Sequence, residues 1–504
     1  MTRRPPTLGA ALLPIAAMAG LFVLGALVLS PTAELLIVVL LGAAAVAGAV
    51  AVRQGCTFDD IQTATGAKVA SVLPALLILL SIGMLIASWV ISGTIPTLVY
   101  WGIRWVDPRF LVLTAFLTTA LMSLFTGTSW GSAGTIGVAL LGTAAALDAP
   151  LAATAGAVVS GAYFGDKMSP LSDSTNICAI GAGAPLYAHI RHMLYTAVPS
   201  FLVATVVYAL VGRLGSAPSA MPDSARTLLA DLDASFTLGA VALVPALIVV
   251  IGIVRRTPPV LAIAVSSAVA VLLAVGIQGV AVGDALTAVV SGVRLPMLTD
   301  SASAGDAFAR LVERGGLYSM APTLVVVLAA FLLAGAMDAS GSLDLLVERL
   351  LGTVRSTFGL IAATMGAGAT TIALTSHGGV TALIVGGLFQ GAYRERALAP
   401  ENLSRSLEDS VTITEPLMPW TVSAVFMATT LGVPTVAYAP WAVFCWLGPV
   451  FSLTWAGLWE RTGFGLRRLP SSDPGGVALD TTVRPVLGSD ACEPVPDSVA
   501  SPSS

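Results

Sequence analysis

The chain has 504 residues, of which 56% are hydrophobic and 10% are charged, and its formal net charge is −4 at pH 7. Because soluble domains carry about 25% charged residues, this composition excludes an ordinary soluble protein and indicates an all-α polytopic membrane protein. No basic patch with interleaved aromatic residues occurs, so we expect no nucleic-acid partner.

The sequence lacks the common catalytic and metal-binding motifs. It contains no GxxxxGK[ST] phosphate loop, no HExxH pair and no GxSxG elbow. The cysteines, Cys56, Cys178, Cys445 and Cys492, occur singly and without metal spacing. We therefore expect neither an enzyme nor a bound cofactor.

Apolar runs of membrane-crossing length follow one another along the chain. A helix needs roughly 20 residues to cross a hydrocarbon core of ~30 Å. In the first half such runs cover Leu8–Ser30, Glu34–Val52, Ala70–Ser92, Phe110–Phe125, His192–Gly212, Phe236–Val254 and Pro259–Gln278. In the second half they cover Leu317–Met337, Thr357–Thr375, Pro416–Leu431 and Ala437–Leu458. Three shorter pieces, Gly134–Leu147, Leu151–Phe164 and Val380–Ala392, indicate half-helices or parts of broken helices.

Positive charges predict the orientation. Lys and Arg in short loops favour the cytoplasmic side, and arginines flank both ends of the apolar region: Arg3, Arg4, Arg461, Arg467 and Arg468. We therefore expect about twelve transmembrane helices in a bacterial cytoplasmic membrane, with both termini in the cytoplasm. The first run resembles a signal peptide, but we expect it to be retained as the first span.

Landmarks recur at a nearly constant separation, which predicts an internal duplication. Ser92-Gly93 returns as Ser340-Gly341 after 248 residues, Thr128–Gly131 as Thr375–Gly378 after 247, and Pro170-Leu171 as Pro416-Leu417 after 246. The predicted organisation is N-terminal helices and a loop (1–68), a first repeat (69–213), a connector with two transmembrane helices (214–316), a second repeat (317–463) and a disordered cytoplasmic tail (464–504).

Each repeat contains helix breaks, and these predict where a site lies. Broken helices are tolerated at membrane depth where the freed backbone groups line a cavity, and in secondary transporters they form the binding site. Hydroxyl-bearing residues and a proline lie at these breaks. We expect the following residues to support the site: Thr128, Ser129, Thr375, Ser376 and Pro416.

A cluster of polar residues lies in the first repeat between Gly161 and Asn176. Ionisable groups at membrane depth mark ion paths by default. Pro170 interrupts the helix, so Asp166, Ser169 and Asp173 can surround one point, with Asn176 on the same face as Asp173 if the helix resumes. Because burial favours the protonated form of a carboxyl group, the same oxygen can hold either a proton or a cation. Lys167 is either a salt-bridge partner of Asp166 or Asp173, or a lysine reaching the interface.

A second polar cluster, from Glu408 to Trp420, offers Asp409, Thr412 and Glu415 as further ion ligands. The separation of 246 residues places Glu415 where Ser169 lies and Thr412 where Asp166 lies, so the two halves are expected to differ chemically. We expect Glu408 to be the last solvated charge of a loop. His189 and His192 are likewise expected in a cytoplasmic loop rather than in a metal site.

Several stretches resemble the NhaC family of bacterial Na+/H+ antiporters. They are residues 92–102, 126–131, 160–173, 189–195 and 402–410, and the run from Gly161 to Asp173 is the most specific. The resemblance implies a fold of inverted repeats, a Na+ site, and exchange of Na+ for H+ across the lipid bilayer. Together with the first polar cluster, it leads us to expect Na+ at Asp166, Asp173 and Asn176. Two alternatives stay open: an antiporter of malate or lactate coupled to Na+ and H+, with an anion at the helix breaks, and a passive channel. A homodimer also stays open.

Overall fold

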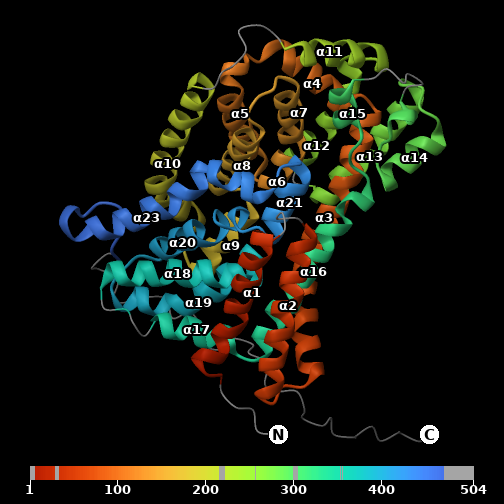
Figure 1. The fold of residues 1–504 in the computed structure, drawn as a ribbon. Helices are drawn as coiled ribbons and strands as arrows, with labels where there is room; N and C mark the ends of the chain where they lie inside the picture. The colour runs from red at the N-terminus through yellow and green to blue at the C-terminus, as the bar shows by residue number, and fades with distance from the viewer. Residues whose placement is uncertain are drawn as a thin grey trace, which may run out of the picture. The chain divides into compact units, whose positions relative to one another are not determined.

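The computed structural model describes residues 6–28, 33–214, 222–255, 257–298, 305–351, 354 and 356–469. In these ranges the chain consists of helices joined by turns, which confirms the all-α prediction (Figure 1). The predicted disordered tail beyond residue 469 and the start of the predicted connector, residues 215–221, lie outside the described residues.

Two helices, α1 (Leu8–Val28) and α2 (Ala33–Arg53), precede the first repeat. The first repeat contains α3 (Phe58–Ile91), α4 (Thr94–Trp105), η1 (Pro108–Phe110), α5 (Leu111–Thr126), α6 (Ser129–Ser132), the π-helical turn η2 (Ala133–Gly137), α7 (Val138–Ala146), α8 (Leu151–Met168), α9 (Asp173–Ala182) and α10 (Leu186–Leu214).

The connector contains α11 (Asp223–Ser235), η3 (Ala240–Leu243), α12 (Val244–Val254), α13 (Pro259–Gly276), α14 (Val282–Ser291), η4 (Leu295–Met297) and α15 (Asp306–Val312). The second repeat contains η5 (Leu317–Met320), α16 (Ala321–Ala339), α17 (Ser342–Leu351), α18 (Thr357–Thr375), α19 (Gly378–Glu395), α20 (Pro400–Leu407), the π-helical turn η6 (Glu408–Thr412), η7 (Glu415–Leu417), α21 (Val422–Leu431), α22 (Thr435–Tyr438), η8 (Ala439–Trp441) and α23 (Val443–Thr462).

Seven helices of the described chain are long and apolar enough to cross a membrane, and three bent pairs raise the number to ten. The bent pairs are α3 with α4 (69°), α11 with the segment Ala240–Gly252 (97°), and α21 with the segment Thr435–Trp441 (89°). The prediction of about twelve stays a prediction; α8 and α23, with 18 and 20 residues, lie outside this count.

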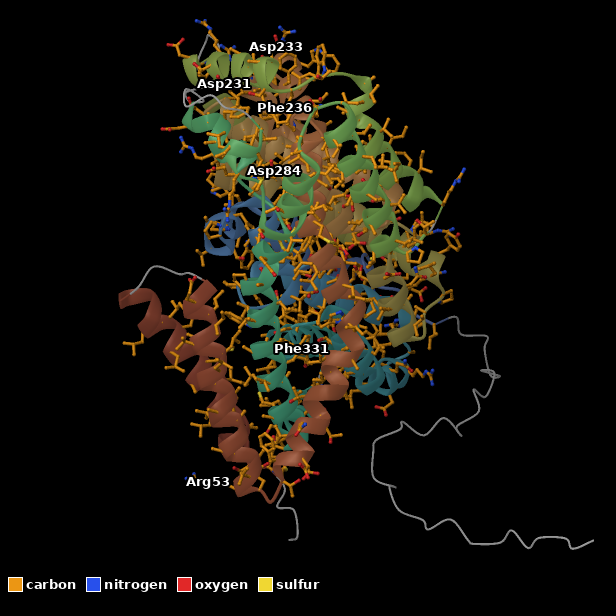
Figure 2. All side chains as sticks on the ribbon, turned by 90° about the vertical axis from the view of Figure 1, so that its right-hand side faces the viewer. Arg53, Asp231, Asp233, Phe236, Asp284 and Phe331 are labelled. Carbon is orange, nitrogen blue, oxygen red and sulfur yellow. The ribbon has the colours of Figure 1, made fainter. Side chains whose placement is uncertain are left out.

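The surface also fits a membrane protein. Asp231 and Asp233 on α11 lie at one end of residues 6–467, and Arg53 at the end of α2 lies at the opposite end (Figure 2). Large aliphatic side chains such as Leu24 (61% exposed) and Leu272 (70% exposed) lie on the surface. Exposed side chains of this kind are accommodated by lipid rather than by water.

The backbone repeats itself more regularly than the sequence does. Residues with a left-handed backbone conformation follow the ends of helices in both repeats. They form pairs separated by 249 residues: Gly127 and Ser376, Asp148 and Ala397, Gly183 and Gly432. The helices α9 and α21 each have ten residues and begin after a capping hydroxyl, Ser172 and Thr421, again 249 residues apart. No insertion therefore separates the two repeats over this region.

This register corrects the predicted alignment. The prediction that Glu415 corresponds to Ser169, and Thr412 to Asp166, is wrong: at a separation of 249 residues Glu415 corresponds to Asp166, and Thr412 to Tyr163. The sequence comparison matched short identities, such as Pro170 with Pro416, although Pro419 occupies the equivalent position. The two halves therefore carry the same kind of group, a carboxylic acid, at the same place.

Helix α8, which carries Asp166, packs directly on α5. A Cβ atom added to Gly161 would lie 2.3 Å from the carbonyl oxygen of Phe116, and one added to Gly165 would lie 2.4 Å from the amide nitrogen of Leu124. Small residues let two membrane helices approach this closely. Glycine at these two positions thus brings the last turn of α8 beside the end of α5 and the break that follows it.

Candidate functional site

Asp166 lies in the last turn of α8 and is 9% exposed. The Ser129 hydroxyl donates a hydrogen bond of 2.9 Å to its Oδ2. Ser129 is the first residue of α6, directly after the break that begins at Gly127, and Thr128 caps this helix by accepting from the amide of Gly131 at 3.2 Å. A carboxylate near the start of a helix is favoured by the helix dipole and by the free amides there.

Glu415 occupies the equivalent place in the second repeat. It is 7% exposed, and its Oε2 would lie 2.8 Å from a Cβ atom added to Gly378, the first residue of α19. Gly378 corresponds to Ser129 at the 249-residue separation. The longer glutamate thus fills the space that the serine side chain occupies in the first repeat.

The two acids belong to one electrostatic environment. Tyr163, one turn before Asp166 on α8, interacts electrostatically with Glu415 and with Asp166, and the charge of Asp166 has a weaker effect on Glu415. The Tyr163 hydroxyl is buried and has no hydrogen-bond partner among the described residues. The site therefore brings together oxygens from both repeats next to their two helix breaks.

The turn between α8 and α9 holds the other residues predicted in the first cluster. Ser169 is fully buried and its hydroxyl accepts from the amide of Leu171 at 3.3 Å. Asn176 donates through Nδ2 to the carbonyl oxygens of Pro170 at 3.2 Å and Ser172 at 2.7 Å. Both side chains thus fix the break at Pro170, which the sequence predicted.

Asp173 differs from the predicted buried ligand. It is the first residue of α9 and its side chain is exposed, although its negative charge interacts electrostatically with Asp166. The prediction that both aspartates are buried is wrong for Asp173, which lies at the exposed start of α9 directly after the capping residue Ser172. The hydroxyl of Thr175 instead joins α9 to α8, donating to the carbonyl oxygens of Asp166 and Lys167 at 3.1 Å each.

A second charged cluster lies beside this site. Lys167, 1% exposed, forms an ion pair with Asp409 of η6, which is fully buried. The Thr196 hydroxyl donates to the same Asp409 oxygen at 3.3 Å. The predicted alternatives for Lys167, pairing with Asp166 or Asp173 or reaching the interface, are therefore wrong: Lys167 pairs across the two repeats.

Burial also corrects two further expectations. Glu408 is 1% exposed and is not a solvated loop charge, since η6 continues α20 into the interior. His189 and His192 are 0% and 5% exposed on α10 and do not lie in a loop. Thr412 is buried and donates to the carbonyl oxygen of Glu408 at 2.9 Å, and its role as an ion ligand stays a prediction.

The supporting residues of the second repeat lie at its breaks. Thr375 ends α18 and shares a hydrogen bond with Thr381 at 2.5 Å, and Ser376 adopts the left-handed conformation that stops the helix. The carbonyl oxygen of Ser376 accepts from the amide of Val422 at 3.2 Å, which ties α21 to this break. Pro416 offers its carbonyl oxygen to the Tyr438 hydroxyl at 2.7 Å.

Comparison with known proteins agrees with this arrangement. Residues 161–457 match the model of the Na+/H+ antiporter family, a range that includes Asp166, Glu415 and every break after Gly161.

The chain belongs to the Na+/H+ antiporter family.

Individual members of the family are similar along most of the chain. An uncharacterized Na+/H+ antiporter of Haemophilus influenzae is 41% identical, covering 93% of this chain and 98% of its own length. The Na+/H+ antiporter NhaC of Alkalihalophilus pseudofirmus is 35% identical, covering 89% and 95%. A malate-2H+/Na+-lactate antiporter of Bacillus subtilis is 30% identical, covering 79% and 83%. The resemblance to NhaC antiporters and the multi-pass membrane architecture are thereby confirmed.

Sequence reasoning overlooked two features of this family member. Tyr163 was not singled out because a tyrosine in an apolar helix usually packs in the core. The equivalence of Asp166 and Glu415 was missed because the alignment was two to three residues out of register. The correct separation of 249 residues is present in the sequence. It joins Gly127-Thr128 to Ser376-His377, and Gly183-Ala-Pro185 to Gly432-Val-Pro434.

Proposed function

We propose that the chain exchanges Na+ for H+ across the cytoplasmic membrane, with Asp166 and Glu415 as the groups that hold Na+ and H+ alternately. One observation carries the proposal. Each repeat supplies one buried carboxylic acid at the same register, next to its own helix break, and the two acids interact electrostatically. Family membership supports it independently.

The chemistry follows from the proximity of two acids in a poorly solvated site. Two neighbouring carboxylates cannot both be ionised there without a compensating positive charge. Either a proton neutralises one of them, or Na+ lies between both. Oxygen ligands suit a small hard cation, so binding of Na+ releases a proton and binding of a proton releases Na+. Competition of this kind couples the two fluxes in opposite directions.

Further oxygens complete the proposed Na+ shell. The Ser129 hydroxyl already contacts Asp166, and the Tyr163 hydroxyl adds a neutral oxygen on the same helix. Asp173 is exposed, and an exposed carboxylate faces water rather than lipid. We place it on the approach to Asp166, with Ser169 and Asn176 holding the turn between them.

Asp409 has a different role in this proposal. Its Oδ1 is engaged by Lys167 and by Thr196, so the negative charge of Asp409 is already balanced without Na+. We assign the Lys167–Asp409 pair to holding the two repeats together beside the ion site, rather than to binding the transported cation.

The test uses the full-length chain in proteoliposomes loaded with a pH-sensitive dye. A pulse of Na+ should move protons in the opposite direction, and Asp166→Asn and Glu415→Gln, which keep the side-chain size, should each abolish this flux. Asp223→Asn, at a carboxylate that is 96% exposed on α11, serves as the matched control and should transport normally. Normal exchange by either of the first two variants would refute the assignment.

An organic-acid antiporter is the second candidate, favoured by the 30% identity to the malate-2H+/Na+-lactate antiporter. In the same liposomes this candidate requires malate or lactate for proton movement, whereas Na+/H+ exchange does not. Adding Na+, Li+, K+ and malate in turn separates these functions. A passive channel would move Na+ without an opposing proton flux.

The orientation with both termini in the cytoplasm remains part of the proposal. It rests on the arginines that flank the apolar region. Labelling of single cysteines introduced near each end, in intact cells and in everted vesicles, tests it.

A further inference from the structure

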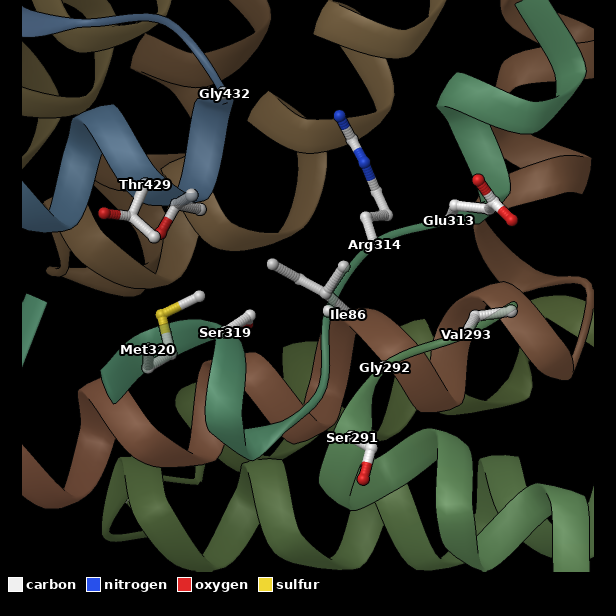
Figure 3. A pocket seen from close by; sticks show the side chains of 12 residues that line it. Ile86, Ser291, Gly292, Val293, Glu313, Arg314, Ser319, Met320, Thr429 and Gly432 are labelled. Atoms are coloured by element: carbon white, nitrogen blue, oxygen red, sulfur yellow. The ribbon is translucent and has the colours of Figure 1, made fainter. Parts of the chain in front are cut away.

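A cavity of about 350 Å³ lies between α3, the end of α14, the loop after α15, η5 and the end of α21 (Figure 3). It is separate from Asp166 and Glu415, neither of which lines it. Its wall includes Ile86, Arg314, Ser319, Met320, Thr430 and Gly432. Ser319 is exposed, whereas Met320 and Thr430 are 2% and 3% exposed, so the cavity leads from the surface into the interior.

Arg314 places a positive charge in the lining of this cavity, and no described acidic side chain forms an ion pair with it. Its Nη1 is inaccessible to solvent and has no hydrogen-bond partner among the described residues. No described carboxylate lies within ion-pair distance of its guanidinium. Arginine stays protonated in proteins. Arg314 as a whole is half-buried, but its Nη1 is removed from water without a partner among the described residues, which is unfavourable for a hydrogen-bond donor. The position is thus held open for an anion.

The neighbouring acid does not provide that anion. The Glu313 side chain is exposed and accepts a hydrogen bond from the amide of Leu295 at 3.2 Å. Figure 3 shows the Glu313 carboxylate and the Arg314 guanidinium pointing in different directions. The Glu313 carboxylate therefore binds the backbone of η4 and forms no ion pair with Arg314 in the described structure.

The cavity lining indicates which anion fits. A guanidinium binds a carboxylate through two parallel hydrogen bonds. The Thr430 hydroxyl, which is buried and has no hydrogen-bond partner in the part of the chain that the structure describes, offers a second polar contact. Ile86 and Met320 provide an apolar wall for a short carbon chain. A volume of about 350 Å³ lies in the range of small-molecule pockets and exceeds what chloride needs.

We propose that this cavity binds a small organic carboxylate of a few carbon atoms through Arg314, with Thr430 as a second contact. The cavity lies at the C-terminal end of α21, whose N-terminal end lies beside Glu415. Helix α21 has ten residues, a length of about 15 Å, so the anion and the cation sites occupy opposite ends of one short rigid element. The proposal does not depend on the proposed exchange of Na+ for H+.

The experiment measures binding to the purified full-length chain in detergent by isothermal titration calorimetry. Acetate, lactate and succinate are the carboxylate probes, and inorganic phosphate and chloride are the comparison anions. We expect saturable binding of at least one carboxylate. Arg314→Gln should weaken this binding at least 10-fold, and Arg314→Lys, which keeps the charge but loses the planar fork, should weaken it less. Arg294→Gln, at an exposed arginine nearby, is the matched control and should bind normally.

Two further variants keep the test decisive. Thr430→Val is nearly isosteric and removes the second contact without opening a cavity, so a folded protein with several-fold weaker binding supports the site even if Arg314 variants do not fold. Asp166→Asn should bind the carboxylate normally although it transports no Na+, which separates this proposal from the preceding one. Absence of saturable carboxylate binding, equal binding by Arg314→Gln or by Thr430→Val, or equal binding of phosphate or chloride would overturn the proposal.

Discussion

Gly378 sets the position of the Glu415 carboxylate, and this leads to a sharp test of the two-acid site. A Cβ atom at Gly378 would lie 2.8 Å from Glu415 Oε2, whereas ordinary contacts of this kind begin near 3.4 Å. The carboxylate must therefore move by about 0.6 Å in Gly378→Ser. Because ion ligands must be held within about 0.5 Å of their working geometry, we expect the apparent affinity for Na+ to fall about 10-fold, or about 1.4 kcal/mol.

A compensating change should restore the site. Glu415→Asp shortens the side chain by one carbon–carbon bond, about 1.5 Å, so alone it also weakens Na+ binding. Combined with Gly378→Ser it rebuilds the Ser129–Asp166 arrangement of the first repeat. We expect the double variant to bind Na+ within about 3-fold of the wild type, which corresponds to a coupling energy of 1 kcal/mol or more between the two positions.

The assay is Na+-induced proton movement in everted membrane vesicles over a series of Na+ concentrations. Gly387→Ala is the matched control, since it lies on the same helix α19 with no atom within 4 Å of the added Cβ. It should leave the affinity unchanged. Unchanged affinity in Gly378→Ser, or strictly additive losses in the double variant, would refute the reasoning that the two repeats hold their acids by complementary side-chain lengths.

Three further predictions follow from other contacts. Lys167→Met leaves Asp409 buried without its partner and should destabilise the protein by about 3–5 kcal/mol, measured by thermal unfolding in detergent; adding Asp409→Leu should recover most of this loss, and no recovery would contradict a buried pair. Asp173→Asn should lower the rate of Na+ exchange less than 5-fold in proteoliposomes, because this side chain is exposed; complete loss would return Asp173 to the ion shell. Ala397→Gly should raise stability by about 1 kcal/mol, since Ala397 is exposed at φ 51°, whereas Ala392→Gly within α19 should lower it by a similar amount; the unfolding midpoints decide.

The general architecture could be predicted because it depends on composition and local sequence. Long apolar runs specify membrane helices, and breaks at Gly127, Pro170 and Ser376 follow from residues that stop a helix or permit a left-handed turn. Asp166 could be found because a charge in an apolar helix is conspicuous. Each of these signals is contained in a few neighbouring residues.

The remaining features depend on contacts between distant segments. Nothing near Lys167 in the sequence indicates that its partner is Asp409, 242 residues away. His189 lies near Arg191, and Glu408 lies near Arg405 and Asp409, so the local sequence predicted exposure to solvent, yet α10 and η6 pack against other helices and bury both side chains. Burial of a polar residue is decided by tertiary packing, which a local pattern does not contain.

The corrected register also changes what the duplication means for the site. With Asp166 matched to Glu415, the differences between the halves include one methylene group in the acid and one side chain at the start of the helix after the break, Ser129 against Gly378. These two differences compensate each other, because the shorter acid meets a hydroxyl donor and the longer acid meets a glycine. Glutamate has one more rotatable bond than aspartate, and Glu415 lies in the short turn η7 rather than on a continuous helix such as α8. The structure thus pairs a rigidly held carboxylate with one that has more freedom to move, a combination suited to a site that must release its ion as readily as it binds it.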